Sequence, residues 1–194
     1  SLNSEERNYE YFCGRRYHAY GPMYLRPNDV EELDTEDLLH HTLLLLLDQR
    51  LYLAPLKHTP KKILDLGTGT GIWSIDVVDK LCAETSVTGC DISPVQPCWV
   101  PPNLTFYVEN IFLMGGPFDW DATPKYDLVH CRNLCTAVKD WPALINGAYR
   151  SLRSGGFLEV QELIPLPFAE ESAQDSQMAE LLSDAYTACG IDLV

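Results

Sequence analysis

The sequence has no long hydrophobic segment and few cationic side chains. Its longest leucine run, Leu43 to Leu47, is far shorter than the ~20 residues that a membrane-spanning helix needs. It contains 14 Lys and Arg against 28 Asp and Glu, for a net charge of -14. This charge would repel a phosphate backbone, whose affinity for proteins depends on neutralisation by Lys and Arg. We therefore expect no membrane association and no direct nucleic-acid binding.

Paired cysteine motifs are missing as well. The seven cysteines include no C-x-x-C pair, and no histidine stands at zinc-finger spacing, so no metal site is predicted. Cys131 and Cys135 lack a third ligand and are expected to be buried thiols, as are most of the other cysteines. The charged start SLNSEERNYEYF lacks the apolar segment of a signal peptide. Together these features favour a reducing compartment, the nucleus or the cytoplasm.

The first 33 residues differ in composition from the rest of the chain. Residues 1–33 are rich in Tyr and Arg and are predicted to form an aromatic arm that packs on the core or takes part in binding. Residues 34–194 form the predicted main domain. It opens with a leucine-rich helix from about 35 to 53, N-capped by Asp34 or Thr35, which we expect to be largely buried.

Strand-like and helix-like patterns then alternate along the chain. Alternation of this kind predicts an α/β fold, in which a doubly wound, mostly parallel sheet carries helices on both faces. One helix is expected to begin at an Asp140 cap and to stop at Gly155, and a final helix should run from about 170 to 189. The other expected elements are a helix over 71–82 and five strands over 61–67, 86–91, 104–110, 126–131 and 155–163.

The stretch ILDLGTGTGIW, residues 63–73, places a glycine-rich turn directly after the first of these strands. Gly67 allows a tight bend, Gly69 lets a ligand touch the backbone, and Gly71 lets the following helix pack closely. The order is not the G-x-G-x-x-G of dinucleotide sites, and Asp65 precedes the first glycine. A carboxylate suits a cationic ligand better than a diphosphate. S-adenosylmethionine fits, because it carries a sulfonium and an ammonium group and no phosphate.

Polar residues also end the next two predicted strands. Asp91 can accept hydrogen bonds from both ribose hydroxyls, and Glu109 and Asn110 can take the adenine amino group. No G-x-x-x-x-G-K-[ST] motif occurs, which excludes a P-loop nucleotide hydrolase. The predicted cofactor residues on these segments, including two isoleucines that flank the adenine ring, are Asp65, Gly67, Thr68, Gly69, Thr70, Gly71, Asp91, Ile92, Glu109, Asn110 and Ile111.

These motifs resemble those of class I S-adenosylmethionine-dependent methyltransferases, and more closely the fungal LaeA-like methyltransferases. The resemblance runs from about Glu6 to Glu162 and is carried by RPND, DLLHH, LDLGTGTGIW, DISPVQPCWVPPNLTF, YDLVHCRNL and LRSGGFLEVQE. It implies a Rossmann-like fold, S-adenosylhomocysteine as product, and control of secondary metabolism or development. Partner proteins or a homodimer are expected, and the sequence does not identify the methyl acceptor. Glu109-Asn110 stands where this family usually has Asp-Asp.

A class I sheet has seven strands, whereas the sequence predicts five. We therefore expect a C-terminally incomplete chain that lacks strands six and seven and has its fifth strand at the edge of the sheet.

Methyl transfer needs positioning and, for a protonated nucleophile, a base. His130 is the candidate base, although it could instead contact the cofactor or be structural. Arg132 and Tyr20 are further cofactor candidates, and Tyr17 or Tyr24 could serve in place of Tyr20 to close over the site. Other polar candidates at the ends of strands four and five are Asn133, Glu159, Gln161 and Glu162, whereas His40 and His41 are expected to be structural.

Two alternatives stay open on the sequence alone. The chain could be a regulatory module that binds the cofactor without turnover, or a small-molecule methyltransferase of a biosynthetic pathway.

Overall fold

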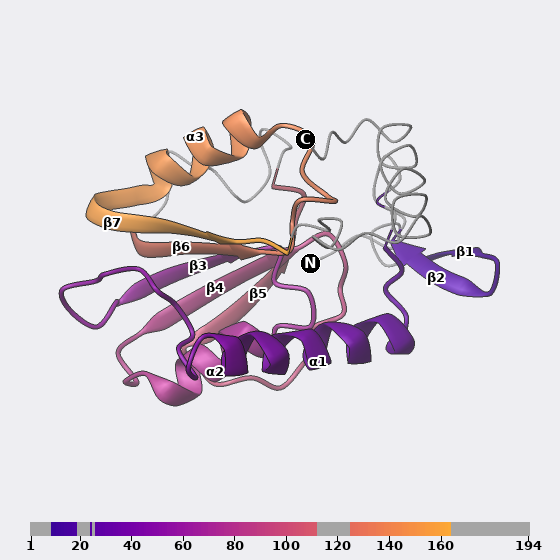
Figure 1. The fold of residues 1–194 in the computed structure, drawn as a ribbon, viewed down its shortest axis with the longest axis horizontal. Helices are drawn as coiled ribbons and strands as arrows, with labels where there is room; N and C mark the ends of the chain where they lie inside the picture. The colour runs from indigo at the N-terminus through magenta and orange to yellow at the C-terminus, as the bar shows by residue number, and fades with distance from the viewer. Residues whose placement is uncertain (1–8, 19–23, 25, 112–124, 164–194) are drawn as a thin grey trace, which may run out of the picture.

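The computed structural model describes residues 9–18, 24, 26–111 and 125–163. Its centre is a sheet of five parallel strands in the order β5-β4-β3-β6-β7 (Figure 1). Chain order starts in the middle of this sheet, runs to one edge and then returns to the other, which is the doubly wound, Rossmann-like arrangement expected from the sequence. The strands are β3 (Lys62–Leu66), β4 (Ser86–Asp91), β5 (Leu104–Val108), β6 (Tyr126–Arg132) and β7 (Leu152–Gln161).

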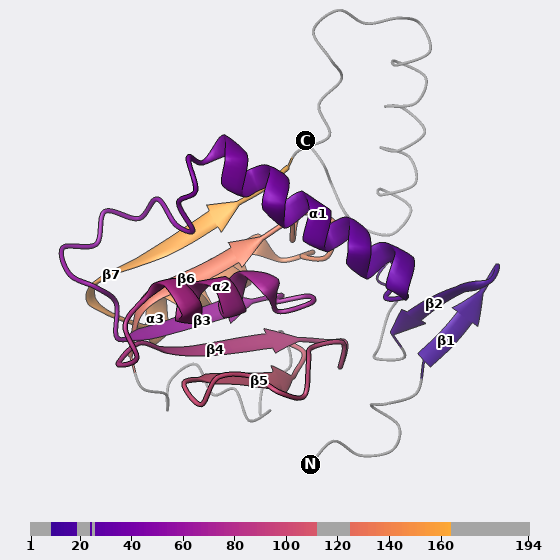
Figure 2. The ribbon, with the colours of Figure 1, turned by 90° about the horizontal axis from the view of Figure 1, so that it is seen from below.

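Helices cover both faces of this sheet (Figures 1 and 2). One face carries α1 (Val30–Leu46) and α2 (Ile72–Lys80), and the other carries α3 (Trp141–Ser151). Alternate residues of one strand therefore enter two different cores: Ile63 packs with Trp73 and Val77 of α2, whereas Leu64 packs with Leu144 of α3. The central strands are buried on both sides, which explains their nearly continuous apolar sequences.

The predicted aromatic arm contains a short hairpin, β1 (Tyr9–Phe12) paired with β2 (Arg15–His18). It is tied to the start of α1 by Arg15, whose guanidinium donates two hydrogen bonds to Asp29 at 2.6 and 2.9 Å. Asn28 in turn donates to the Ser93 hydroxyl at 3.2 Å, beyond the end of β4. These contacts fix the chain just before α1 against the carboxyl ends of the strands.

The prediction for the first long helix was wrong in its bounds. The helix α1 begins at Val30 because Asp29, rather than Asp34 or Thr35, is the N-cap and accepts from the Glu32 amide. It ends at Leu46 rather than near residue 53, since Asp48 and Gln49 adopt positive φ angles of 52° and 60°.

The expected burial of α1 was also wrong. Its leucines surround the helix, so only one side can face α2, and Leu38, Leu45 and Leu46 are exposed. His40 and Leu44 are the buried residues of this helix. A leucine-rich helix thus need not be a core helix when it lies on the outside of a three-layer fold.

Asp140 caps α3 as predicted, by accepting from the Ala143 amide at 2.9 Å, but Gly155 does not end this helix. The helix ends at Ser151, whose hydroxyl donates back to the Ala148 carbonyl, and Gly155 lies inside β7 with a φ of 79°. Among the described strands β7 forms one edge of the main sheet, as expected. The segment predicted to hold the final helix, and anything that follows β7, lies outside the described residues.

The expectation of mostly buried thiols was wrong for the cysteines that the structure describes. Cys90 and Cys131 are buried inside the sheet and Cys135 is half-buried, but Cys13, Cys82 and Cys98 are exposed. The exposed cysteines lie in the turn between β1 and β2 and in loops flanking β4, where no core is available to cover them.

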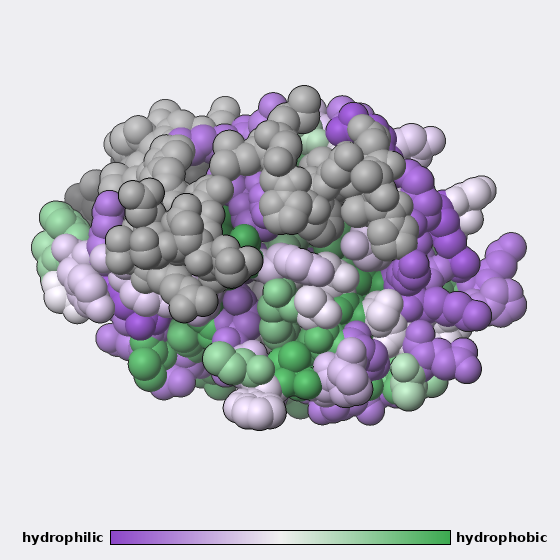
Figure 3. Space-filling view, turned by 180° about the vertical axis from the view of Figure 1, so that it is seen from behind, coloured by the Kyte–Doolittle hydropathy of each residue, from purple (hydrophilic) through white to green (hydrophobic). Residues whose placement is uncertain are grey.

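The surface is mixed in character. On the face turned away in Figure 1, several separate groups of hydrophobic side chains lie among hydrophilic ones (Figure 3). Trp99, in the loop after β4, has 95% of its surface exposed. Among the helices that the structure describes, we find none with both the length and the hydrophobicity required to cross a bilayer.

Candidate functional site

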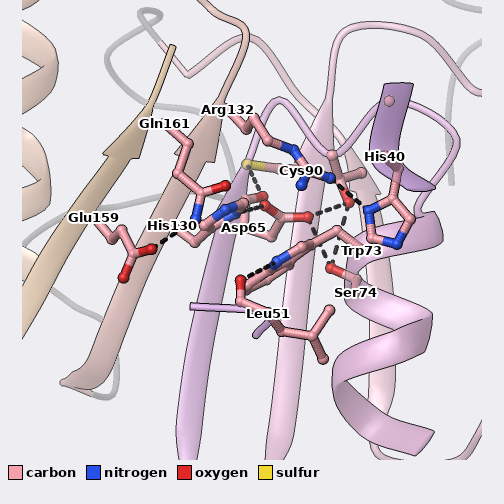
Figure 4. A network of polar contacts seen from close by, with 12 residues as sticks. His40, Leu51, Asp65, Trp73, Ser74, Cys90, His130, Arg132, Glu159 and Gln161 are labelled. Atoms are coloured by element: carbon pink, nitrogen blue, oxygen red, sulfur yellow. Dashed lines mark hydrogen bonds and ion pairs between the residues drawn. The ribbon is translucent and has the colours of Figure 1, made fainter. Parts of the chain in front are cut away.

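Two polar residues meet inside the sheet because of strand register. Asp65 near the end of β3 lies opposite His130 of β6, and both side chains point to the face covered by α2. His130 Nδ1 lies 2.8 Å from Asp65 Oδ1, and the ring of Trp73 stacks on the imidazole at 3.6 Å with an interplanar angle of 4° (Figure 4). Both polar side chains are almost completely buried. The imidazole ring of His130 is therefore fixed by a hydrogen bond at its edge and by ring stacking on one face.

The Asp65 carboxylate is occupied by internal donors. In addition to His130, it accepts hydrogen bonds from the hydroxyl of Ser74 at 2.8 Å (Figure 4) and from that of Thr68 at 2.6 Å. These three partners come from β6, the glycine turn and α2 respectively. Asp65 thus ties the three segments together, and its hydrogen bonds orient the turn that follows.

The glycine turn adopts a conformation that other residues rarely take. Gly67, Gly69 and Gly71 have φ angles of 67°, 55° and 82°. A Cβ at Gly67 would lie 2.4 Å from Leu134 Cδ2, and one at Gly71 would lie 2.5 Å from Phe106 Cζ. Gly71 is the N-cap of α2, so its lack of a side chain permits the close packing predicted for it.

Asp91 at the end of β4 faces the same turn. Its two carboxylate oxygens accept from the amides of Gly69 and Ser93, each at 2.9 Å. Burial raises the pKa of Asp91, while these two backbone donors lower it. Each carboxylate oxygen can accept a further hydrogen bond, so Asp91 has capacity left for a ligand.

A cavity of about 420 Å³ opens on one side of Asp91. Its lining includes the predicted adenine residues at the end of β5 and residues between Leu134 and Ala143, in the connection after β6 and the first turn of α3, most of which are small or apolar. We call it the large cavity. The predicted residues that line it are Gly67, Asp91, Ile92, Glu109, Asn110 and Ile111.

A second cavity of about 80 Å³ shares Tyr24, Gly67, Asp91 and Leu134 with the first and therefore adjoins it. We call it the small cavity. Most of its lining is polar or charged, in contrast to the large cavity. The predicted residues that line it are Asp65, Gly67, Thr68, Gly69, Thr70, Asp91, His130, Arg132 and Asn133.

The small cavity also contains residues that the sequence reasoning did not assign to it. Arg26 precedes α1, while Glu36 and His40 lie on α1, which crosses above the glycine turn. The contact of α1 with this turn includes a hydrogen bond of 2.7 Å from the Thr70 hydroxyl to Asp37. The available signal was the polar positions of a leucine-rich helix, Glu36, Asp37 and His40, which share one face at helical spacing.

His40 connects Arg132 to α2. Its Nδ1 accepts from Arg132 Nη2 at 2.7 Å (Figure 4), and its Nε2 donates to Asp76 Oδ2 at 3.1 Å. Burial lowers the pKa of His40, although Asp76 opposes this shift, so the ring is neutral at neutral pH. His40 is therefore a satisfied structural histidine, as expected, and it positions the guanidinium of Arg132 in the small cavity.

Other predicted candidates have structural partners instead. Glu159 accepts from the amides of Leu53 and Ala54, and Glu162 accepts from those of Leu134 and Cys135. Gln161 donates to Glu159 at 2.7 Å. These side chains hold two loops on the sheet, and none of the three lines either cavity.

Three tyrosines of the arm were candidates to close over the cofactor, and the structure shows which of them lie at the cavities. Tyr24 lines both cavities, Tyr17 lines neither, and Tyr20 lies outside the described residues. Burial raises the pKa of Tyr24, so its hydroxyl stays protonated at neutral pH.

Comparison with known proteins agrees with this geometry. Residues 38–188 match the family described as a methyltransferase domain. The chain is 42% identical over 192 residues to Methyltransferase pytC of Aspergillus terreus, which covers 97% of this chain and 58% of that protein. It is 34% identical over 182 residues to laeA of Emericella nidulans, described both as a protein-methionine methyltransferase and as a secondary metabolism regulator. That match covers 90% of this chain and 46% of laeA, so the chain spans about half the length of these relatives.

Among solved structures, the fold resembles the plantazolicin methyltransferase BpumL in complex with a monoazolic desmethylPZN analog and SAH. The TM-score is 0.57, with 84% of this chain and 62% of that chain covered. At 15% sequence identity this likeness shows the fold alone.

Proposed function

The chain belongs to this methyltransferase domain family, and on that premise we propose that it binds S-adenosylmethionine and transfers its methyl group. The observation that carries the proposal is the pair of adjoining cavities with Asp91 on their common border. One cavity is charged and the other has a mixed, largely apolar lining. S-adenosylmethionine is divided in the same way, with its charges at the methionine end and a flat ring at the other.

The residues present fit this cofactor. Gly67 and Gly69 line the small cavity with bare backbone, and a Cβ at either position would collide with Leu134 or Glu36, so the turn can present only backbone to a ligand. The small cavity, with its acidic groups and Arg26, would hold the methionine end, Asp91 the ribose, and the large cavity with Glu109 and Asn110 the adenine. The carboxylates outnumber the cations, which suits a ligand with net positive charge.

The bound cofactor supplies a methyl carbon activated by a cationic sulfur, which an electron pair of the acceptor can displace. Among the chain's own residues, His130 is the candidate base. Its Nδ1–H donates to Asp65, so its Nε2 carries a lone pair, and this buried atom has no hydrogen-bond partner among the described residues. The stacked Trp73 and the Asp65 carboxylate hold the ring in one orientation. The acceptor atom Nε2 of His130 is thus held in a fixed position.

For the biological role we propose regulation of fungal secondary metabolism or development, as described for laeA, through partner proteins or a homodimer in nucleus or cytoplasm. Similarity over 90% of this chain supports this role. The stronger match to a protein named only as a methyltransferase favours a second candidate, transfer to a small molecule.

Calorimetry with S-adenosylmethionine, S-adenosylhomocysteine and NAD tests cofactor choice. We expect both sulfur compounds to bind and NAD not to bind; the opposite result would overturn the proposal. Transfer from methyl-tritiated cofactor into a fungal extract then separates the candidates. Label in the macromolecular fraction supports the regulator, and label in the small-molecule fraction supports the second candidate. Binding without label in either fraction indicates a module without turnover.

The variant His130→Asn tests the base. The Asn amide can still donate to Asp65, but the ring nitrogen Nε2 is lost. We expect transfer to fall by about 100-fold with little change in S-adenosylhomocysteine affinity. Equal losses of transfer and of affinity would instead assign His130 to cofactor binding.

A further inference from the structure

Glu36 occupies an unusual place over the glycine turn. The residue lies on α1, and its Oε2 would be 2.8 Å from a Cβ built on Gly69. Its carboxylate therefore lies close to the bare backbone of Gly69, which lines the same small cavity. Glu36 lines the small cavity and not the large one. It thus belongs to the compartment that the proposed function assigns to the charged end of the cofactor.

The three carboxylates that line the small cavity differ in their hydrogen-bond partners. Asp65 accepts three hydrogen bonds from side chains, and Asp91 accepts two from backbone amides. The Glu36 carboxylate has no hydrogen bond or ion pair with any residue that the structure describes. A half-buried carboxylate without a donor is the group in the site that gains most from an incoming cation.

The electrostatic surroundings of Glu36 are mostly acidic. Burial raises the pKa of Glu36 to about 7, and the charge of Asp91 contributes in the same direction, while Arg26 opposes it. At neutral pH the carboxyl group is therefore close to half ionised. The titratable and charged groups around it are Tyr24 and Arg26 before α1, Glu32, Asp37 and His40 on α1, Asp65 and Asp91 at strand ends, and Arg132 on β6.

Resting on the proposed function, we infer that Glu36 distinguishes the cationic cofactor from its product by the charge on sulfur. S-adenosylmethionine has a sulfonium, whereas S-adenosylhomocysteine has a neutral thioether. Binding of the sulfonium compound stabilises ionised Glu36, and the proton that Glu36 loses goes to solvent. After transfer the sulfur has no charge, so Glu36 takes a proton back from solvent and its attraction for the ligand weakens. The same carboxylate would thus favour cofactor binding and product release.

The test compares wild type with Glu36→Gln and with Asp34→Asn, an exposed acid two residues away on the same helix. Calorimetry near pH 7 in two buffers of different ionisation enthalpy gives both the affinity and the number of protons exchanged. We expect Glu36→Gln to lower S-adenosylmethionine affinity about tenfold, since a nearby charge pair of this kind is worth roughly that factor, and to change S-adenosylhomocysteine affinity less than about threefold. It should also abolish the release of up to about half a proton. Asp34→Asn should behave as wild type.

The ligands' own amino groups titrate near this pH, but this contribution cancels between wild type and Glu36→Gln. If Glu36→Gln does not fold, the effect is measured in wild type as the ratio of S-adenosylmethionine affinity to S-adenosylhomocysteine affinity. We expect this ratio to rise from about pH 6 to about pH 8. The affinities are first corrected for protonation of the free ligands, which NMR measures. An unchanged ratio in Glu36→Gln, or a flat ratio in wild type, overturns the role of Glu36. If wild type binds neither compound, the proposed function itself fails.

Discussion

The two cavities are lined by different kinds of side chain, although they adjoin at Tyr24, Gly67, Asp91 and Leu134. Most of the side chains that close the small cavity are charged or polar, and they come from the segment before α1, from α1, from the glycine turn and from the ends of β3, β4 and β6. The large cavity draws mainly on two strand ends and on the segment from Leu134 to Ala143, where only Lys139 and Asp140 are charged. The small cavity can therefore select a ligand by charge, whereas the large cavity selects by size and shape. Substitutions in each should leave different signatures.

The largest effect is expected at the border, where Asp91 contacts both cavities. Asp91→Ala should lower S-adenosylhomocysteine affinity by about 100-fold or more, because it removes a ribose acceptor and leaves the amides of Gly69 and Ser93 without their partner. Asp79→Ala, an exposed acid of α2, is the control for charge. Calorimetry measures both variants, and a loss of less than about threefold in Asp91→Ala would show that the two cavities do not act as one site.

The next effect concerns the glycine turn. Gly67 and Gly155 both have positive φ, but a Cβ at Gly67 would collide with Leu134, which lines both cavities, whereas Gly155 has nothing within 4 Å. Gly67→Ala should therefore reduce S-adenosylhomocysteine affinity about thirtyfold and stability by about 2 kcal/mol. Gly155→Ala should lose only about 1 kcal/mol, measured by urea unfolding, with normal affinity. Equal affinity losses would contradict the steric explanation.

Filling the large cavity should have a smaller effect that does not depend on charge. Ala137 lines this cavity, and Ala137→Leu should lower the affinities for S-adenosylmethionine and S-adenosylhomocysteine together, each about tenfold, with their ratio unchanged. Ala83→Leu, in an exposed turn, is the matched control. This outcome contrasts with Glu36→Gln, which should change the ratio. A changed ratio in Ala137→Leu would remove the distinction between the cavities.

The smallest effect is on the pH dependence of folding. Burial lowers the folded-state pKa of His40, so the unfolded chain binds more protons and stability falls as the pH drops below about 6.5. The raised pKa of Glu36 acts with the opposite sign: its contribution to stability is present below about 4.5 and is lost as the pH rises through about 7. Urea unfolding between about pH 5 and about pH 8 should show that His40→Gln and Glu36→Gln change the slope in opposite directions, each by at most about 1.4 kcal/mol per pH unit. Changes of the same sign would contradict the assignment.

Much of the sheet side of the site could be predicted. The five strands, the glycine turn, Asp91 and the polar pair Glu109-Asn110 after β5 were found because apolar strands, glycine spacing and polar strand ends are local features of the sequence. The predicted Glu159 and Glu162 turned out to hold loops, since a polar residue at a strand end satisfies a backbone amide as readily as a ligand. The bounds of α1 were missed because Asp29 and Asp34 are equally suitable caps by composition, and packing of the preceding segment selected Asp29.

The sequence by itself determined the order of strands and helices, the cradle at Gly67 to Gly71 and the acids at the strand ends, because these depend on hydrogen bonding and periodicity within short segments. Only the tertiary structure placed Arg26, Glu36 and His40 at the same turn, and it showed that Tyr24 rather than Tyr17 lies there. Those residues reach it through the docking of α1 on α2 and the anchoring of the arm by Arg15 and Asp29. That docking is a contact between surfaces far apart in the chain, and the polar face of α1, although visible in the sequence, does not by itself specify the surface that it contacts.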